Sequence, residues 1–181
     1  MSRLRIFSDA RPDGPLAEHD DGPSIAEALA AVGVRFERWD THAEIAAGAS
    51  QDDVLEAYKA EIDGLMASEG YRSCDVVSMA PDNPQRTVMR RKFLDEHTHA
   101  EDEVRFFVDG RGLFTLHIED EIFEVLCERG DLISVPAGTR HWFDMGPEPH
   151  FVAIRLFTNP DGWVAEFTGT GIAERFPRLV A

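Results

Sequence analysis

The chain has 181 residues, of which 43% are hydrophobic, and its 18 Lys plus Arg against 34 Asp plus Glu give a formal net charge of −16. This length suits a single domain, 1–181, and the ordinary composition excludes disordered, collagen-like and disulfide-scaffold proteins. The excess of acidic residues argues against nucleic acid and against an anionic membrane surface as partners, because both are bound through clustered Lys and Arg. The same charge favours a monomer.

The cysteines and the N-terminal residues predict a cytoplasmic protein. Cys74 and Cys127 lie far apart, with no CxxC pair and no Cys/His zinc spacing around them, so we expect two small buried or half-buried thiols. The first residues carry no apolar run long enough for a signal peptide, and no stretch approaches the ~20 apolar residues of a membrane span. We therefore expect a cytoplasmic location without a membrane anchor.

The first third of the chain mixes helical and strand patterns. Ser24 is the expected N-cap of a helix over 25–32, which Gly33 would stop. The alternating residues 34–39 predict a strand. A second helix is expected to begin at Ser50. Its apolar residues at helical spacing, which should face the core, are Val54, Leu55, Tyr58, Ile62, Leu65 and Met66.

Residues from about 93 to 158 have the character of an all-β core. Short apolar runs separated by turn residues predict a sandwich or a barrel. The expected strands, with one that precedes this region, are 75–79, 104–108, 113–118, 122–125, 131–135 and 151–157. Asp109-Gly110-Arg111-Gly112 is typical of a tight hairpin turn. A terminal segment is expected to pack back onto this barrel through Trp163, Phe167, Ile172 and Phe176.

Four potential metal ligands occur in two segments of this β region. His97 and His99 are two residues apart, so on a strand both rings project from one face. Glu103 has the same parity if the strand continues unbroken, which a bulge would prevent. His141 follows in a later segment. Imidazole nitrogen and carboxylate oxygen are ligands of divalent first-row metals such as Fe, Ni and Mn. Each residue alone could simply be packed or solvated, but two His and a Glu inside a barrel would otherwise be costly buried polar groups, which favours a metal site.

The spacing of these residues resembles the two motifs of the cupin superfamily. The segments are His97-x-His99-x3-Glu103-x6-Gly110 and Gly130-x5-Pro136-x-Gly138-x2-His141. Arg91 stands where a glycine usually precedes the first motif, and Met145 where an asparagine usually ends the second, but neither position is a ligand. The resemblance implies a mainly β, cupin-type small barrel (a double-stranded β-helix or jelly roll). A few helices in residues 1–92 would precede a metal-binding core at about 93–158, and a short C-terminal segment would follow it.

Longer segments are similar to the acireductone dioxygenases. They comprise residues 93–112, 135–146 and 155–165, and Met145 fits that family's pattern. The similarity extends from about Asp75 to Ala165. This resemblance implies that one Fe(II) or Ni(II) ion per monomer is bound by His97, His99, Glu103 and His141.

The same resemblance implies an oxygen-dependent cleavage in methionine salvage. An octahedral ion with four protein ligands keeps two positions, which suits a substrate that chelates through two oxygens. The family's substrate, 1,2-dihydroxy-5-(methylthio)pent-1-en-3-one, is such a chelator, and its dianion is electron-rich enough for O2 to attack carbon while the metal serves as Lewis acid and template. The implied products are formate and 4-methylthio-2-oxobutanoate with Fe(II), or formate, carbon monoxide and 3-(methylthio)propanoate with Ni(II). The sequence does not decide between the two metals.

Arg105 shares its parity with Glu103, so we expect it to point into the barrel, where a guanidinium needs an anion. One interpretation is a salt bridge with Glu103 or Asp102. We favour stabilisation of the substrate dianion, because Glu103 would be engaged by the metal and a guanidinium is a good partner for an oxyanion.

Five further residues have candidate roles by resemblance. Glu96 and Asp102 match acidic positions that flank the ligands in the family and would contribute to catalysis by orienting the metal-bound histidines; a solvated surface role is the alternative. Aromatic residues are expected either to wall a pocket for the thioether tail of the substrate or to belong to the ordinary core. These residues are Phe93, Phe143 and Trp163.

Two other classes of function fit the same four ligands. A non-catalytic cupin that binds metal or a small ligand would have no need for an inward Arg105. A metal-dependent isomerase on the same barrel would need no O2. Oxygen consumption separates both from a dioxygenase.

Overall fold

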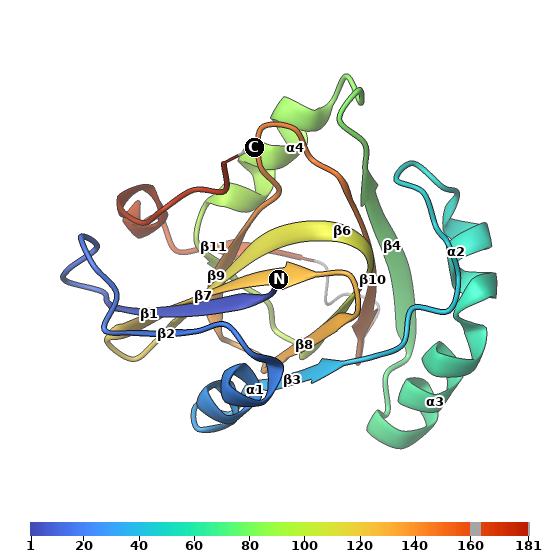
Figure 1. Ribbon diagram of the computed structural model, residues 1–181, viewed down its shortest axis with the longest axis horizontal. Coiled ribbons are helices and arrows are strands. Elements are labelled where there is room, and N and C mark those ends of the chain that lie inside the picture. Colours follow the sequence, from blue (N-terminus) through green and yellow to red (C-terminus); the bar gives the residue numbers. More distant parts are fainter. Residues whose placement is uncertain (160–163, 181) are drawn as a thin grey trace.

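The computed structural model describes residues 1–159 and 164–180, and it consists mainly of antiparallel β-strands (Figure 1). One sheet has the order β2-β1-β7-β6-β9-β5-β11. Its strands are β2 (Ala17–His19), β1 (Arg3–Ser8), β7 (Glu121–Glu128), β6 (Glu103–Ile118), β9 (Arg140–Asp144), β5 (His97–Thr98) and β11 (Glu166–Phe167). The second sheet shares β6 and has the order β4-β10-β6-β8-β3. Its other strands are β4 (Ser73–Met79), β10 (Phe151–Phe157), β8 (Asp131–Val135) and β3 (Arg35–Arg38).

The helices of the N-terminal part of the chain lie around the two sheets, and the strands of that part belong to them (Figure 1). The helical segments are α1 (Gly22–Ala30), α2 (Gln51–Ala57), α3 (Lys59–Glu69), α4 (Arg86–Leu94) and the 3-10 turn η2 (Ile172–Arg175). Strands β1 and β4 from this part extend the two sheets by pairing with β7 and β10. Within the described residues, no helix combines the length and the apolar character that crossing a membrane requires.

The expected strands 131–135 and 151–157 are confirmed as β8 and β10. The expected hairpin turn at 109–112 is wrong, because β6 runs through it without a break. Gly110 instead has a φ of +69° and marks the place where β6 bends from one sheet into the other, beside an irregular register opposite β10. A turn and a bulge both use glycine at positive φ, so the local sequence alone could not distinguish them.

Gly110→Ala is expected to destabilise the fold by at least about 2 kcal/mol, because the left-handed φ costs a Cβ-bearing residue about 1–2 kcal/mol and overpacking adds roughly 1–3. A Cβ at Gly110 would lie 1.9 Å from the carbonyl oxygen of His150. For a chain of this size the melting temperature should fall by roughly 4–8 °C. Gly70→Ala is the matched control, since its φ of +75° is similar but the space around it is open. Equal losses in the two variants would contradict the steric explanation.

The helices differ from the sequence-based expectation at their ends. Asp21, not Ser24, caps α1, because its side chain accepts a hydrogen bond from the amide of Ser24 and Pro23 is favourable in a first helical turn. Ser50 caps α2 as expected, through the amide of Asp53. The helix then breaks at Tyr58 into α2 and α3, although the expected core residues remain buried or half-buried on one side.

Other elements were only partly expected. The strand expected at 34–39 is the shorter β3, and β4 begins two residues before the expected 75–79. Helix α4 and strand β9 were not expected. In the terminal segment, Phe176 packs against Phe7 and Trp142 as expected. Phe167 lies opposite His97, with its ring centre 5.7 Å from that of His97, but its side chain stays largely exposed.

Candidate metal centre

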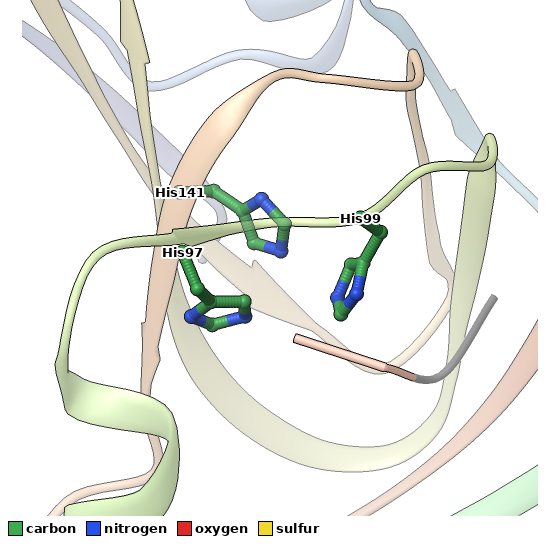
Figure 2. A group of neighbouring side chains, drawn as sticks. All are labelled: His97, His99 and His141. Atoms are coloured by element: carbon green, nitrogen blue, oxygen red, sulfur yellow. The ribbon is translucent and has the colours of Figure 1, made fainter. Parts of the chain in front are cut away.

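Three histidines meet at one end of the larger sheet. His97 lies on β5 directly opposite His141 on β9, and His99 follows β5 by one residue. One ring nitrogen of each histidine lies within 4.8 Å of those of the other two, and all three side chains are buried. Figure 2 shows the rings turned toward a common point. The cross-strand pairing of β5 and β9 therefore brings together two motifs that are far apart in sequence.

Hydrogen bonds to the backbone determine how these rings present their nitrogens. Nδ1 of His97 lies 2.8 Å from the carbonyl oxygen of Asp95, and Nδ1 of His141 lies 2.8 Å from that of Thr139. Nδ1 of His99 lies 3.0 Å from the carbonyl oxygen of Val164. A carbonyl oxygen can only accept, so each Nδ1 must carry the proton. In the neutral imidazole the Nε2 atom then has its lone pair free for a metal.

Glu103 completes the group from the start of β6. Its Oε2 lies 3.3 Å from Nε2 of His99 and 3.9 Å from Nε2 of His141. Within the described part of the chain, this Oε2 and Nε2 of His141 are buried and have no hydrogen-bond partner. Buried polar atoms without a partner are costly, and two acceptor atoms facing each other are worse. A cation between them would satisfy both, so the residues fit a divalent metal.

The electrostatics of the site favour neutral His97 and His141 and an ionised Glu103. Burial lowers the pKa of His141 to about 3, and burial also lowers the pKa of His97. Burial acts in the same direction on His99, but the hydrogen bond and the charge of Glu103 outweigh it and raise the pKa of His99. Burial raises the pKa of Glu103, but Arg105, His99 and His141 outweigh it and hold this pKa well below its usual value. A carboxylate among neutral imidazoles is the donor set that a divalent first-row metal prefers.

Arg105 is buried beside Glu103 rather than beside Asp102. Its Nη2 and Nε donate to Oε1 of Glu103 at 2.7 and 3.2 Å. The guanidinium carbon lies 5.0 Å from the ring centre of Phe114 and 4.7 Å from that of Phe143. The alternative interpretation, a salt bridge with Glu103, is thus confirmed, and the bridge uses Oε1 of Glu103, whereas Oε2 faces the histidines. Arg105 also lines the cavity, so the two interpretations do not exclude each other.

A cavity of about 590 Å³ opens beside the three histidines. Its polar wall contains His97, His99, His141, Arg105, Arg155 and Asp75. Its apolar wall contains Val77, Met79, Met89, Phe93, Phe143 and Phe167. Two of the three aromatic residues expected at a pocket therefore line this one, and the third, Trp163, lies outside the described residues.

The two flanking acidic residues do not contact the rings of the candidate ligands. Glu96 is buried and accepts from His117 Nδ1 at 2.6 Å and from the hydroxyls of Thr168 and Thr170 at 2.7 and 3.1 Å. Asp102 accepts from the amide of Ala137 at 2.7 Å, in the turn before β9. The expectation that these carboxylates orient the metal-binding rings needs correction, because backbone carbonyls hold every Nδ1.

Sequence reasoning missed the polar pair Asp75 and Arg155 and the two methionines in the cavity wall. Both members of the pair lie in segments whose pattern predicts a strand and nothing more. Which strand lies beside β10, and in what register, is decided by the fold, and this register places Asp75 opposite Arg155. Met79 and Met89 look like ordinary core residues in the sequence, since nothing local distinguishes a cavity wall from a packed interior.

The chain is similar to known proteins over almost its whole length. The model of the ARD/ARD' family matches residues 3–165. The acireductone dioxygenase of Stutzerimonas stutzeri (strain A1501) is 63% identical over 179 residues, which cover 99% of this chain and 99% of the relative. That of Stenotrophomonas maltophilia (strain R551-3) is 62% identical over 180 residues, covering 99% and 97%. The structure of acireductone dioxygenase from Bacillus anthracis, with a cadmium ion in its active center, aligns with a TM-score of 0.80 and 31% identity over 92% of this chain and 98% of that one. This likeness confirms the expected cupin-type fold, although the strands form two sheets joined through β6 rather than one closed barrel.

Proposed function

The chain belongs to the ARD/ARD' family of metal-dependent acireductone dioxygenases, and we propose that His97, His99, His141 and Glu103 hold one Fe(II) or Ni(II) ion at its active site. The observation that carries this proposal is the convergence of three histidine ring nitrogens and one buried carboxylate oxygen. Among the described residues, Nε2 of His141 and Oε2 of Glu103 have no hydrogen-bond partner. When bound, such an ion would act as a Lewis acid and as a template for a chelating substrate. The activity is the oxygen-dependent cleavage of an acireductone in methionine salvage.

We propose that Arg105 binds the negative charge of the substrate. This role is supported by its burial, its place in the cavity wall and the two aromatic rings that hold its guanidinium. With a divalent ion present, the ion, Glu103 and Arg105 carry a formal charge of +2 − 1 + 1 = +2, which a substrate dianion would neutralise. Binding of the dianion, rather than of the neutral enediol, is therefore favoured by the charges of the site.

We propose that Phe93 and Phe143, with Trp163, pack against the thioether tail of the substrate. The proposal is supported by the place of the first two rings in the cavity wall, since sulfur packs favourably on aromatic rings. Glu96 and Asp102 would then act through other residues. Glu96 accepts hydrogen bonds from the hydroxyls of Thr168 and Thr170 and so holds that segment beside His97. Asp102 accepts a hydrogen bond from the amide of Ala137 and so stabilises the turn before His141.

The first experiment is oxygen uptake by metal-stripped protein that has been reloaded with Fe(II) without air and then given synthetic acireductone. We expect rapid uptake, with formate and 4-methylthio-2-oxobutanoate as products, and no uptake above the spontaneous rate by the metal-free protein. Loading with Ni(II) should instead give formate, carbon monoxide and 3-(methylthio)propanoate. No uptake by protein with confirmed iron content would favour a non-catalytic binding cupin, and conversion of the substrate without O2 would favour an isomerase. The monomeric state and the cytoplasmic location stay predictions.

A further inference from the structure

Three charged side chains lie in a row across three neighbouring strands beside the metal centre. Arg105 on β6 is directly opposite Arg155 on β10, and Arg155 is directly opposite Asp75 on β4. All three line the cavity. Two like charges directly opposite each other destabilise a sheet, so both guanidinium groups need a nearby anion. Arg105 has Glu103, and Arg155 has Asp75.

The Arg155 side chain is held in a fixed orientation. Its Nε donates to Oδ1 of Asp75 at 2.8 Å and its Nη2 to Oδ2 at 2.5 Å, which is a two-point pairing along one edge of the guanidinium. Its guanidinium carbon lies 5.5 Å from the ring centre of Phe157, and that ring lies 6.1 Å from the ring of His99. Only 13% of the Arg155 side chain is exposed. The group is therefore ordered at a short distance from the candidate ligands.

Arg155 has donors that the described residues do not use. A guanidinium offers five N–H groups, and the pairing with Asp75 accounts for one on Nε and one on Nη2. No hydrogen bond between described residues engages Nη1 of Arg155, and this residue lines the cavity. Arg105 is paired through the same two atoms, because its Nε and Nη2 donate to Glu103. Arg155 thus offers the cavity a fixed cationic donor that no residue within 1–159 or 164–180 satisfies.

An acireductone needs such a donor. It carries three oxygens on adjacent carbons, and chelation of a metal uses two of them, whichever two these are. The third oxygen is then buried in the cavity and needs a hydrogen bond there, since an unsatisfied buried acceptor is costly. A guanidinium suits this oxygen better than a neutral donor does, because it shares the negative charge of the dianion.

We propose that Arg155, oriented by Asp75, is a substrate-binding residue that donates from Nη1 to the acireductone oxygen left free by chelation. This inference rests on the proposed function and adds a specificity determinant to it. Arg155 would make the site prefer a chelator with three adjacent oxygens over one that has only two.

The test compares two chelators on protein loaded with one equivalent of Ni(II), without O2, so that binding is measured by titration and no turnover occurs. Acireductone has the third oxygen, whereas pentane-2,4-dione chelates through two oxygens and has no other. For Arg155→Met we expect acireductone to bind about 10–100-fold more weakly, the range for a hydrogen bond to a charged group, with the affinity for pentane-2,4-dione changed by less than about twofold. Arg155→Lys keeps the charge opposite Asp75 and should lose less than Arg155→Met.

Arg5→Met is the matched control, because Arg5 forms a similar cross-strand pair with Glu124 away from the cavity. It should change neither affinity. Equal weakening of both chelators in Arg155→Met, or of neither, would overturn the assignment, because a purely structural pair cannot distinguish the third oxygen. Wild-type protein that holds Ni(II) and binds pentane-2,4-dione but not acireductone would instead contradict the proposed function itself, and the inference with it.

Discussion

His99→Ala is expected to weaken metal binding by more than about 100-fold and to abolish oxygen uptake at ordinary iron concentrations. The loss of a residue that only hydrogen-bonds to a metal ligand already lowers the metal affinity roughly 10–100-fold, and His99→Ala removes a ligand itself. His99 is also the histidine closest to Oε2 of Glu103, so its loss leaves that buried oxygen further from any compensating group. The measurement is the metal content of the purified variant, followed by competition with a chelator of known affinity.

The control for His99→Ala is His150→Ala. His150 is exposed and pairs with Asp109 on the surface, away from the other histidines. Its replacement should leave the metal content and the oxygen uptake as in the wild type. If His99→Ala retained one tightly bound ion, the assignment of His99 as a ligand would be wrong, and the site would need another donor in its place.

Arg105→Ala is expected to lower turnover about 10²–10³-fold while the metal content stays at one ion per chain. Loss of a single preorganised group that stabilises developing charge typically has an effect of this size. The ligands themselves remain, since Arg105 contacts Glu103 only through Oε1. Loss of the metal together with the activity would refute the assignment of Arg105 to the substrate.

The same substitution has a second consequence for stability, because Arg105 is also the counter-ion of a fully buried carboxylate. Removing one partner of a buried ion pair costs about 3–5 kcal/mol, so the metal-free variant should melt well below the metal-free wild type. A bound divalent ion would compensate Glu103 in its place, and the difference between variant and wild type should shrink when metal is added. Arg105→Lys, which keeps the charge, should melt close to the wild type in both states. Thermal melts with and without metal give the comparison.

The sequence was sufficient for the identity of the candidate ligands and of the family. His97, His99 and Glu103 lie in one short segment, so they stay close together in space. The single strand on which their shared parity was to act is not present, because β5 ends at Thr98 and β6 begins at Glu103. His141 comes from another strand, but its motif is long and specific enough to join the set by resemblance. The strands β8 and β10 were predicted with their correct ends because apolar runs between turn residues are local patterns.

The tertiary structure decided everything that depends on which strands lie side by side. The bend of β6 at Gly110 exists because β10 approaches it closely, and a local pattern cannot tell such a bend from a hairpin. Backbone carbonyls, not Glu96 or Asp102, orient the histidine rings. Two of these carbonyls are local, and the third, that of Val164 beside His99, comes from a distant part of the chain. The row of Arg105, Arg155 and Asp75 follows from register between strands that are distant in the chain. The sequence defines which side chains are present. The pairing and the register of the strands determine which of these side chains form ion pairs, line one cavity or contact one substrate.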